Sequence, residues 1–144
     1  MKKHASALPQ SAPVLPKEWK GTVTTTSVGA TNHRSPNHND HVGKEKHVPG
    51  WNIHEEAITL TITRQEGRHL EAVMKSPRGH ERWLIGAFSA DGKQIQAATR
   101  GGACIFTLSG DTLSASGSGR GSDGDFDHWL NNYSATWFEF TAVK

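Results

Sequence analysis

The chain has few of the features that mark several large classes of protein. Its 144 residues include one cysteine, Cys104, so no disulfide can form within the chain. No apolar run is long enough to cross a membrane as a helix. The formal net charge is only +2 and both signs are interspersed, which is not the basic patch of a nucleic-acid-binding protein. The sequence therefore gives no indication of a disulfide scaffold, a membrane span or a nucleic-acid partner.

Motifs for cofactor or nucleophilic chemistry are also missing. The glycine-rich residues 117–121 do not open a helix within a crossover unit, so they are no phosphate-binding loop. No Gly-x-Ser-x-Gly elbow occurs. Cys104 is flanked by apolar residues and is typical of a small core side chain. We expect no cofactor.

What the chain does contain favours β structure. It has fifteen glycines and many serines and threonines, which point to frequent turns and strands. Residues 57–64 alternate, with Ile58, Leu60 and Ile62 on one face and threonines on the other. If residues 65–67 form a three-residue loop with Gly67 in the left-handed conformation, Ile62 faces Leu70 in the next strand.

Turn signals then recur along the chain. Ser76-Pro77-Arg78-Gly79 and Asp91-Gly92 each separate two alternating segments, and Gly110-Asp111 suits a tight turn that begins with glycine. The last of these turns predicts that Leu108 pairs with Leu113, Phe106 with Ala115 and Cys104 with Gly117. We also expect a first strand over residues 19–28 and a closing strand over residues 134–143.

These segments predict an all-β fold, an antiparallel up-and-down meander of about eight strands closed into a small barrel. A two-sheet sandwich is the alternative, because the pattern does not prove closure. Phe126, Trp129, Leu130 and Tyr133 recur at helical spacing and predict one short helical turn before the last strand. Residues 1–16 are expected to be a disordered leader, and residues 17–144 one barrel domain with a long polar loop at 29–50.

The chain resembles the calycin group of barrels, which includes lipocalins, avidins and fatty-acid-binding-type proteins. The resemblance rests on Trp19-Lys20-Gly21 at the opening of the first strand and on the meander that follows. It implies that Trp19 closes the base of the barrel and that the lumen holds a small ligand.

Two polar regions are candidates for chemistry. The loop at 29–50 is rich in histidine, and His38, His41 and His47 are weak candidates for metal ligands, because imidazoles bind zinc, nickel or copper. Without a recognised ligand spacing, the simpler interpretation is a solvated polar lid, and we expect no metal site. Where this loop rejoins the barrel, His54 and Glu56 are candidates for proton transfer or for orienting a ligand. The alternative is a hydrated strand start.

His69 and Glu71 share one face of the strand at 68–75 and form a second candidate acid–base pair. If that face points outward, it is an ordinary solvent face, as in most half-exposed sheets.

The function predicted from these observations is binding of a small, mostly apolar molecule in the barrel lumen beneath the polar lid. The expected wall residues are the large apolar side chains Trp51, Met74, Trp83, Phe88, Phe106, Trp137 and Phe138. One alternative is a barrel enzyme, such as a cyclase, isomerase or hydratase, that relies on shape and one acid–base pair. Another is an interaction module whose outer aromatic face forms a homo-oligomer. The sequence does not indicate a compartment.

Overall fold

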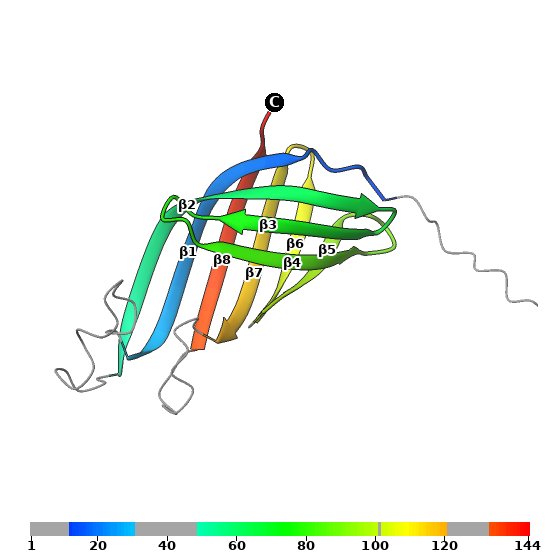
Figure 1. Cartoon of the computed structure of the whole chain (residues 1–144). Helices are drawn as coiled ribbons and strands as arrows, with labels where there is room; N and C mark the ends of the chain where they lie inside the picture. The colour runs from blue at the N-terminus through cyan, green and yellow to red at the C-terminus, as the bar shows by residue number, and fades with distance from the viewer. Residues whose placement is uncertain (1–11, 31–48, 101, 121–132) are drawn as a thin grey trace, which may run out of the picture.

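Eight antiparallel strands follow one another in chain order and close into a barrel (Figure 1). The computed structural model describes residues 12–30, 49–100, 102–120 and 133–144. The strands are β1 (Glu18–Ala30), β2 (Pro49–Glu66), β3 (His69–Lys75), β4 (Glu81–Phe88), β5 (Gln94–Thr99), β6 (Gly102–Ser109), β7 (Thr112–Arg120) and β8 (Tyr133–Ala142). The predicted all-β meander and its closure are confirmed, and the sandwich alternative is wrong.

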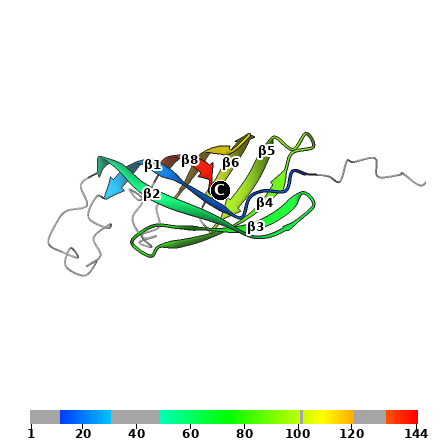
Figure 2. The same ribbon diagram turned by 90° about the horizontal axis from the view of Figure 1, so that it is seen from above.

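The barrel is flattened into two layers. In Figure 1, β2, β3 and β4 run across the front, and β6, β7 and β8 cross behind them at a large angle. Figure 2 shows the same two layers from above. The described part of the chain contains no helix, and so none that could cross a membrane. The predicted helical turn lies in residues 121–132, outside the described residues, and Tyr133 already belongs to β8.

The hairpin between β6 and β7 has the register that its turn glycine predicts. Leu108 pairs with Leu113, Phe106 with Ala115 and Cys104 with Gly117. Gly110 has a φ of 57°, in the left-handed region that glycine enters without steric cost. These predicted pairs are confirmed.

The predicted register between β2 and β3 is wrong. Glu66 pairs with His69, so the turn has two residues, and Ile62 faces Ala72 rather than Leu70. The ladder shifts between Ile62 and Arg64, where a β-bulge adds one residue to β2. The extra residue shifts the inward and outward alternation of β2 by one position, as the extra residue of a three-residue loop would have done. Ile62 and Ala72 therefore still both face the core.

The first hairpin is longer than the sequence predicts. β1 continues to Ala30 and β2 begins at Pro49, and these two residues are paired, as are Gly29 and Gly50. The ends of the expected loop at 29–50 are therefore part of the sheet. The remaining residues, 31–48, lie outside the described part of the chain, together with His38, His41 and His47.

The last strand pairs with the first to close the barrel. Trp19 lies opposite Ala142 in this ladder, and the pairing extends to Val28 and Tyr133. The backbone of β8 lies close against Gly21. A Cβ added there would lie 1.7 Å from the carbonyl oxygen of Glu139, so only glycine fits.

The end of the barrel where β1 begins, the capped end, is filled with side chains. Trp19 is completely buried there, and its Nε1 donates a hydrogen bond of 2.8 Å to the carbonyl oxygen of Pro16. Phe106, Phe138 and Phe140 stack with centroid separations of 5.9 to 6.4 Å.

Residues just before β1 pack against this end. Leu15 is 7% exposed and belongs to the core, and its amide donates a hydrogen bond to Oε1 of Gln65. The expected leader at 1–16 thus includes a segment that covers the capped end, and residues 1–11 lie outside the described residues.

We predict unequal costs for two neighbouring substitutions on β2. Leu60 is 2% exposed inside the barrel, and large-to-small changes in a core typically cost about 2–5 kcal/mol. Thr61 faces outward, where its hydroxyl donates a hydrogen bond of 3.0 Å to Oε2 of Glu18. In denaturant titrations, Leu60→Ala should lose several kcal/mol and Thr61→Ala about 1 kcal/mol or less. Equal losses would contradict this orientation of β2.

Candidate functional site

The inner face of the barrel changes character from one end to the other. Toward the capped end, inward side chains such as Leu113, Ala115, Phe138 and Phe140 are at most 5% exposed. On the same strands, the inward residues nearer the other end, such as Thr136, are partly exposed. We call this other end, where β1 and β7 finish and β2 and β8 begin, the loop end.

The partly exposed inner surface at the loop end forms what we call the cup. Its inward residues come from the two layers and are Thr25, Glu56, Arg82, Thr99, Gly117 and Thr136. In Figure 1, the lower halves of β1, β7 and β8 extend beyond the layer formed by β3 and β4. Small side chains line the cup, and one cation and one carboxylate lie among them.

Arg82 brings a positive charge to the inner side of the barrel. It alternates with the buried residues Leu84 and Phe88 on β4, which places it on their face, yet its own side chain is exposed. The positive charge of Arg82 stabilises the thiolate form of the buried Cys104 on β6 and so acts to lower the pKa of that thiol. Desolvation is the stronger effect, and burial raises the pKa of Cys104 from 9.0 to about 11. Cys104 is therefore a neutral thiol at physiological pH, as its expected core role implies.

The middle of the barrel and its capped end leave no space for a ligand. Core side chains from six strands and from the N-terminal segment surround a cavity of only about 10 Å³, which is room for about one water-sized sphere. The lining residues are Leu15, Leu60, Ile62, Leu70, Ala72, Leu84, Ile95, Phe106 and Leu113. Any ligand held inside the described barrel would have to enter through the cup.

The expected wall residues divide between the two faces of the barrel. Met74, Phe88, Phe106 and Phe138 face inward and are 1 to 5% exposed. Trp51 belongs to β2, but its side chain lies outside the described part.

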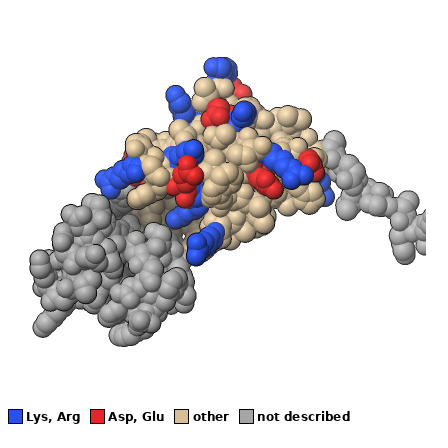
Figure 3. Space-filling model, viewed as in Figure 1, with Lys and Arg blue, Asp and Glu red and all other residues tan. Residues whose placement is uncertain are grey.

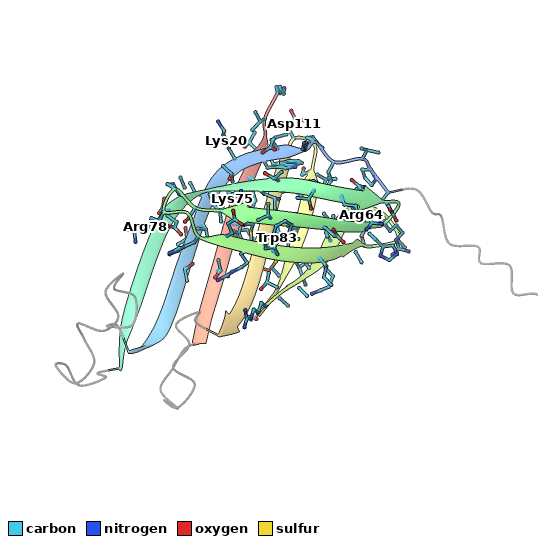
Figure 4. The ribbon with its side chains drawn as sticks, viewed as in Figure 1. Lys20, Arg64, Lys75, Arg78, Trp83 and Asp111 are labelled. Atoms are coloured by element: carbon cyan, nitrogen blue, oxygen red, sulfur yellow. The ribbon has the colours of Figure 1, made fainter. Side chains whose placement is uncertain are left out.

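The prediction that Trp83 and Trp137 line the lumen is wrong, because they lie on the outer surface, with exposures of 60% and 48%. Figure 4 shows Trp83 on the front layer, where it is paired with Val73. Neighbouring positions on a strand point to opposite faces, and Phe138 takes the inner position beside Trp137.

The candidate pair His69 and Glu71 lies on the outer face, as the simpler interpretation held. Both side chains are exposed and stand at the rim of a groove of about 480 Å³ across β2 to β5. Small and aliphatic residues form its floor, among them Ile85, Gly86 and Ala98. No described contact joins the imidazole to the carboxylate, so the pair is not organised for proton transfer.

Arg64 at the same rim is held by carboxylates. Its guanidinium lies 2.6 Å from Oε1 of Glu66 and 3.9 Å from Oε1 of Glu71. The hydrogen bond and the charge of Glu66 raise the pKa of Arg64. All three side chains are well exposed, and exposed ion pairs contribute little to stability. The groove rim therefore carries one cation between two carboxylates.

No protein-family model, curated protein or solved structure matches this chain.

Of the candidates His54 and Glu56, only Glu56 has a described side chain. Glu56 faces the cup, as the prediction of a functional rim requires, and the side chain of His54 lies outside the described part. Within the described residues, no three His, Cys, Asp or Glu side chains come together to hold a metal ion. Arg82 was not predicted to face the barrel interior, although its spacing of two from Leu84 on an alternating strand was the signal for an inward charge.

Proposed function

We propose that the protein binds a small molecule with an apolar body in the cup at the loop end of the barrel. The observation that carries the proposal is the gradient along the inner face, from fully packed at the capped end to partly exposed at the loop end. Binding sites in proteins are concave and mostly apolar, with a few polar groups that fix orientation. The charged groups in the cup are Arg82 and Glu56, and Thr25, Thr99 and Thr136 add hydroxyl groups.

The architecture supports the same proposal. A closed barrel of eight strands is wide enough either to be filled by its side chains or to hold one small ligand, and in this barrel the inward side chains are buried along only part of its length. The buried indole of Trp19 at the base, together with the meander, supports a place among the calycin barrels. The role of residues 31–48 as a lid over the cup stays a prediction.

Filling the cup tests the proposal. Thr136→Phe places a large side chain on the inner face of β8, and Thr141→Phe places the same side chain on the outer face of the same strand. The probe is the fluorescent dye 1-anilinonaphthalene-8-sulfonate, and native mass spectrometry of freshly purified protein detects any compound that co-purifies. We expect Thr136→Phe to weaken dye binding at least about tenfold, which is about 1.4 kcal/mol, and to abolish co-purification.

The control variant should bind the dye as the unaltered protein does. Thermal melting of both variants shows that they remain folded. If both variants bind the dye equally well, the cup is not the binding site.

A further inference from the structure

Two cations on the outer face of the front layer lie beside carboxylates. Arg64 lies 2.6 Å from Glu66, and Lys75 lies 3.0 Å from Glu81. Figure 3 shows groups of both signs mixed over that side of the molecule. Each of these cations is partly neutralised by its neighbour, so this surface presents no concentrated charge of one sign.

Arg82 differs from these cations because it stands on the inner face. It is paired with Met74 across the ladder and is two residues from Leu84, and these two side chains are buried inside the barrel. Side chains at such positions share one face of the sheet. The effect of the Arg82 charge on the inward thiol of Cys104 agrees with this direction. The guanidinium therefore lies where the packed core meets the open cup.

The charge of Arg82 has no partner among the described residues. Within that part of the chain, its guanidinium makes neither an ion pair nor a hydrogen bond. The adjacent carboxylate, that of Glu81, is held on the outer face by Lys75. Glu56 lies on β2, separated from Arg82 by β3, and it already interacts with another group of the chain. A cation at the mouth of a barrel, where apolar walls concentrate its field, attracts an anion.

The space beside Arg82 limits the size of such an anion. Toward the capped end, the core side chains leave a cavity of only about 10 Å³. In the cup, Gly117 and Thr136 on the other layer are small and partly exposed. An apolar body can lie against these residues, but a long chain has no room to continue into the barrel.

We propose that the cup binds a compact organic acid, whose acidic group pairs with the guanidinium of Arg82 and whose apolar body lies against Gly117 and Thr136. This inference rests on the proposed function, since it names the class of molecule that the cup binds. A guanidinium presents paired N–H donors that match the two oxygen atoms of an acidic group. Arg82 is thus the residue that determines the specificity of the site.

Two dyes that differ in one acidic group test the proposal. The first is 1-anilinonaphthalene-8-sulfonate, and the second is N-phenyl-1-naphthylamine, which has the same rings without the sulfonate. We expect Arg82→Gln to raise the dissociation constant of the sulfonate dye about tenfold and that of the uncharged dye less than about twofold, because a hydrogen-bonded charge pair is lost only with the first. Arg82→Lys keeps the charge and should weaken the sulfonate dye less than Arg82→Gln does.

Arg64→Gln is the matched control, since it makes the same change on the outer surface, where Arg64 is paired with Glu66. It should leave the affinity for both dyes unchanged, and circular dichroism of every variant reports the fold. The proposal would be overturned if Arg82→Gln leaves the affinity for the sulfonate dye unchanged. Equal weakening of both dyes would overturn it as well, because Arg82 would then shape the cup without selecting an anion.

Thr136→Phe distinguishes a failure of this inference from a failure of the proposed function. If Thr136→Phe abolishes the binding of both dyes and Arg82→Gln changes neither, the cup binds a molecule but does not select an acid. If Thr136→Phe leaves both dyes bound, the cup is not the site and both proposals fail.

Competition for the sulfonate dye tests the size of the ligand. Naphthalene-2-carboxylate is compact, whereas hexadecanoate carries its acidic group on a long chain. We expect the naphthalene acid to displace the dye at the lower concentration, because the filled barrel has no room for the chain. The reverse order would contradict a compact ligand.

Discussion

Gly21→Ala is expected to open the barrel between its first and last strands. The added Cβ would lie 1.7 Å from the carbonyl oxygen of Glu139 and 2.8 Å from the Cα of Phe140, both backbone atoms. Backbone within a hydrogen-bonded ladder cannot move aside without breaking the ladder. We expect a loss of at least ~4 kcal/mol in the free energy of unfolding, which is at the upper end for one methyl group. Denaturant titration followed by tryptophan fluorescence measures it.

Gly110→Ala is the control for this experiment. Gly110 has a φ of 57°, and a Cβ there would have no atom within 4 Å. Its cost is only that of forcing alanine into the left-handed conformation, about 1–2 kcal/mol. If Gly21→Ala costs no more than Gly110→Ala, the backbones of β1 and β8 are not as close at Gly21 as described.

Trp19→Ala should have the second largest effect. The indole is completely buried, contacts the core from the capped end and is held by the hydrogen bond to Pro16. Removing a buried aromatic side chain costs about 3–5 kcal/mol through lost burial and the cavity that remains. The N-terminal segment that covers this end loses a contact as well, so we expect its backbone amides, including that of Leu15, to exchange hydrogen faster.

Trp83→Ala provides the comparison within the same residue type. This indole is 60% exposed on the outer surface, and its removal should cost about 1 kcal/mol or less. The two variants are compared by thermal melting and by hydrogen exchange. Equal destabilisation would show that Trp19 does not act as the base of the barrel.

The parts of the fold that depend on local chemistry could be predicted from the sequence. Gly110 predicts a tight turn after Ser109, and the position of that turn determines which residues of β6 and β7 are paired. The alternation around Leu60 identifies the buried face of β2 in the same way. The resemblance of the chain to calycins predicted that Trp19 closes the base of the barrel, and Trp19 is completely buried there.

The register of β2 and β3 could not be predicted, because two solutions satisfy the same hydrophobic pattern. A three-residue loop and a two-residue turn with a bulge both bring Ile62 to the core side, and they differ only in which residue is its partner. The bulge between Ile62 and Arg64 has no glycine or proline to mark it. Because of the bulge, the side chain of Gln65 points toward the N-terminal segment, and its Oε1 accepts a hydrogen bond from the amide of Leu15.

The site was harder to predict than the fold because the faces of β4 and β8 are ambiguous. Trp137 and Phe138 are adjacent and both aromatic, so alternation alone does not say which one enters the barrel. Trp83 and Leu84 present the same ambiguity. The structure resolves both pairs in favour of the smaller side chain, since the packed interior has room for Phe138 and Leu84 and leaves the indoles outside.

Pairing of the first strand with the last also determines the order in which the chain can fold. During synthesis, β1 leaves the ribosome long before β8, its partner, exists. Hairpins such as β6–β7 can form early because their contacts are local, whereas the contact of Trp19 with Ala142 closes a loop of nearly the whole chain. Topologies with such distant contacts fold slowly. Until the ladder between β1 and β8 forms, the edge of β1 that faces β8 is unpaired, and it is in this interval that the chain is most exposed to aggregation.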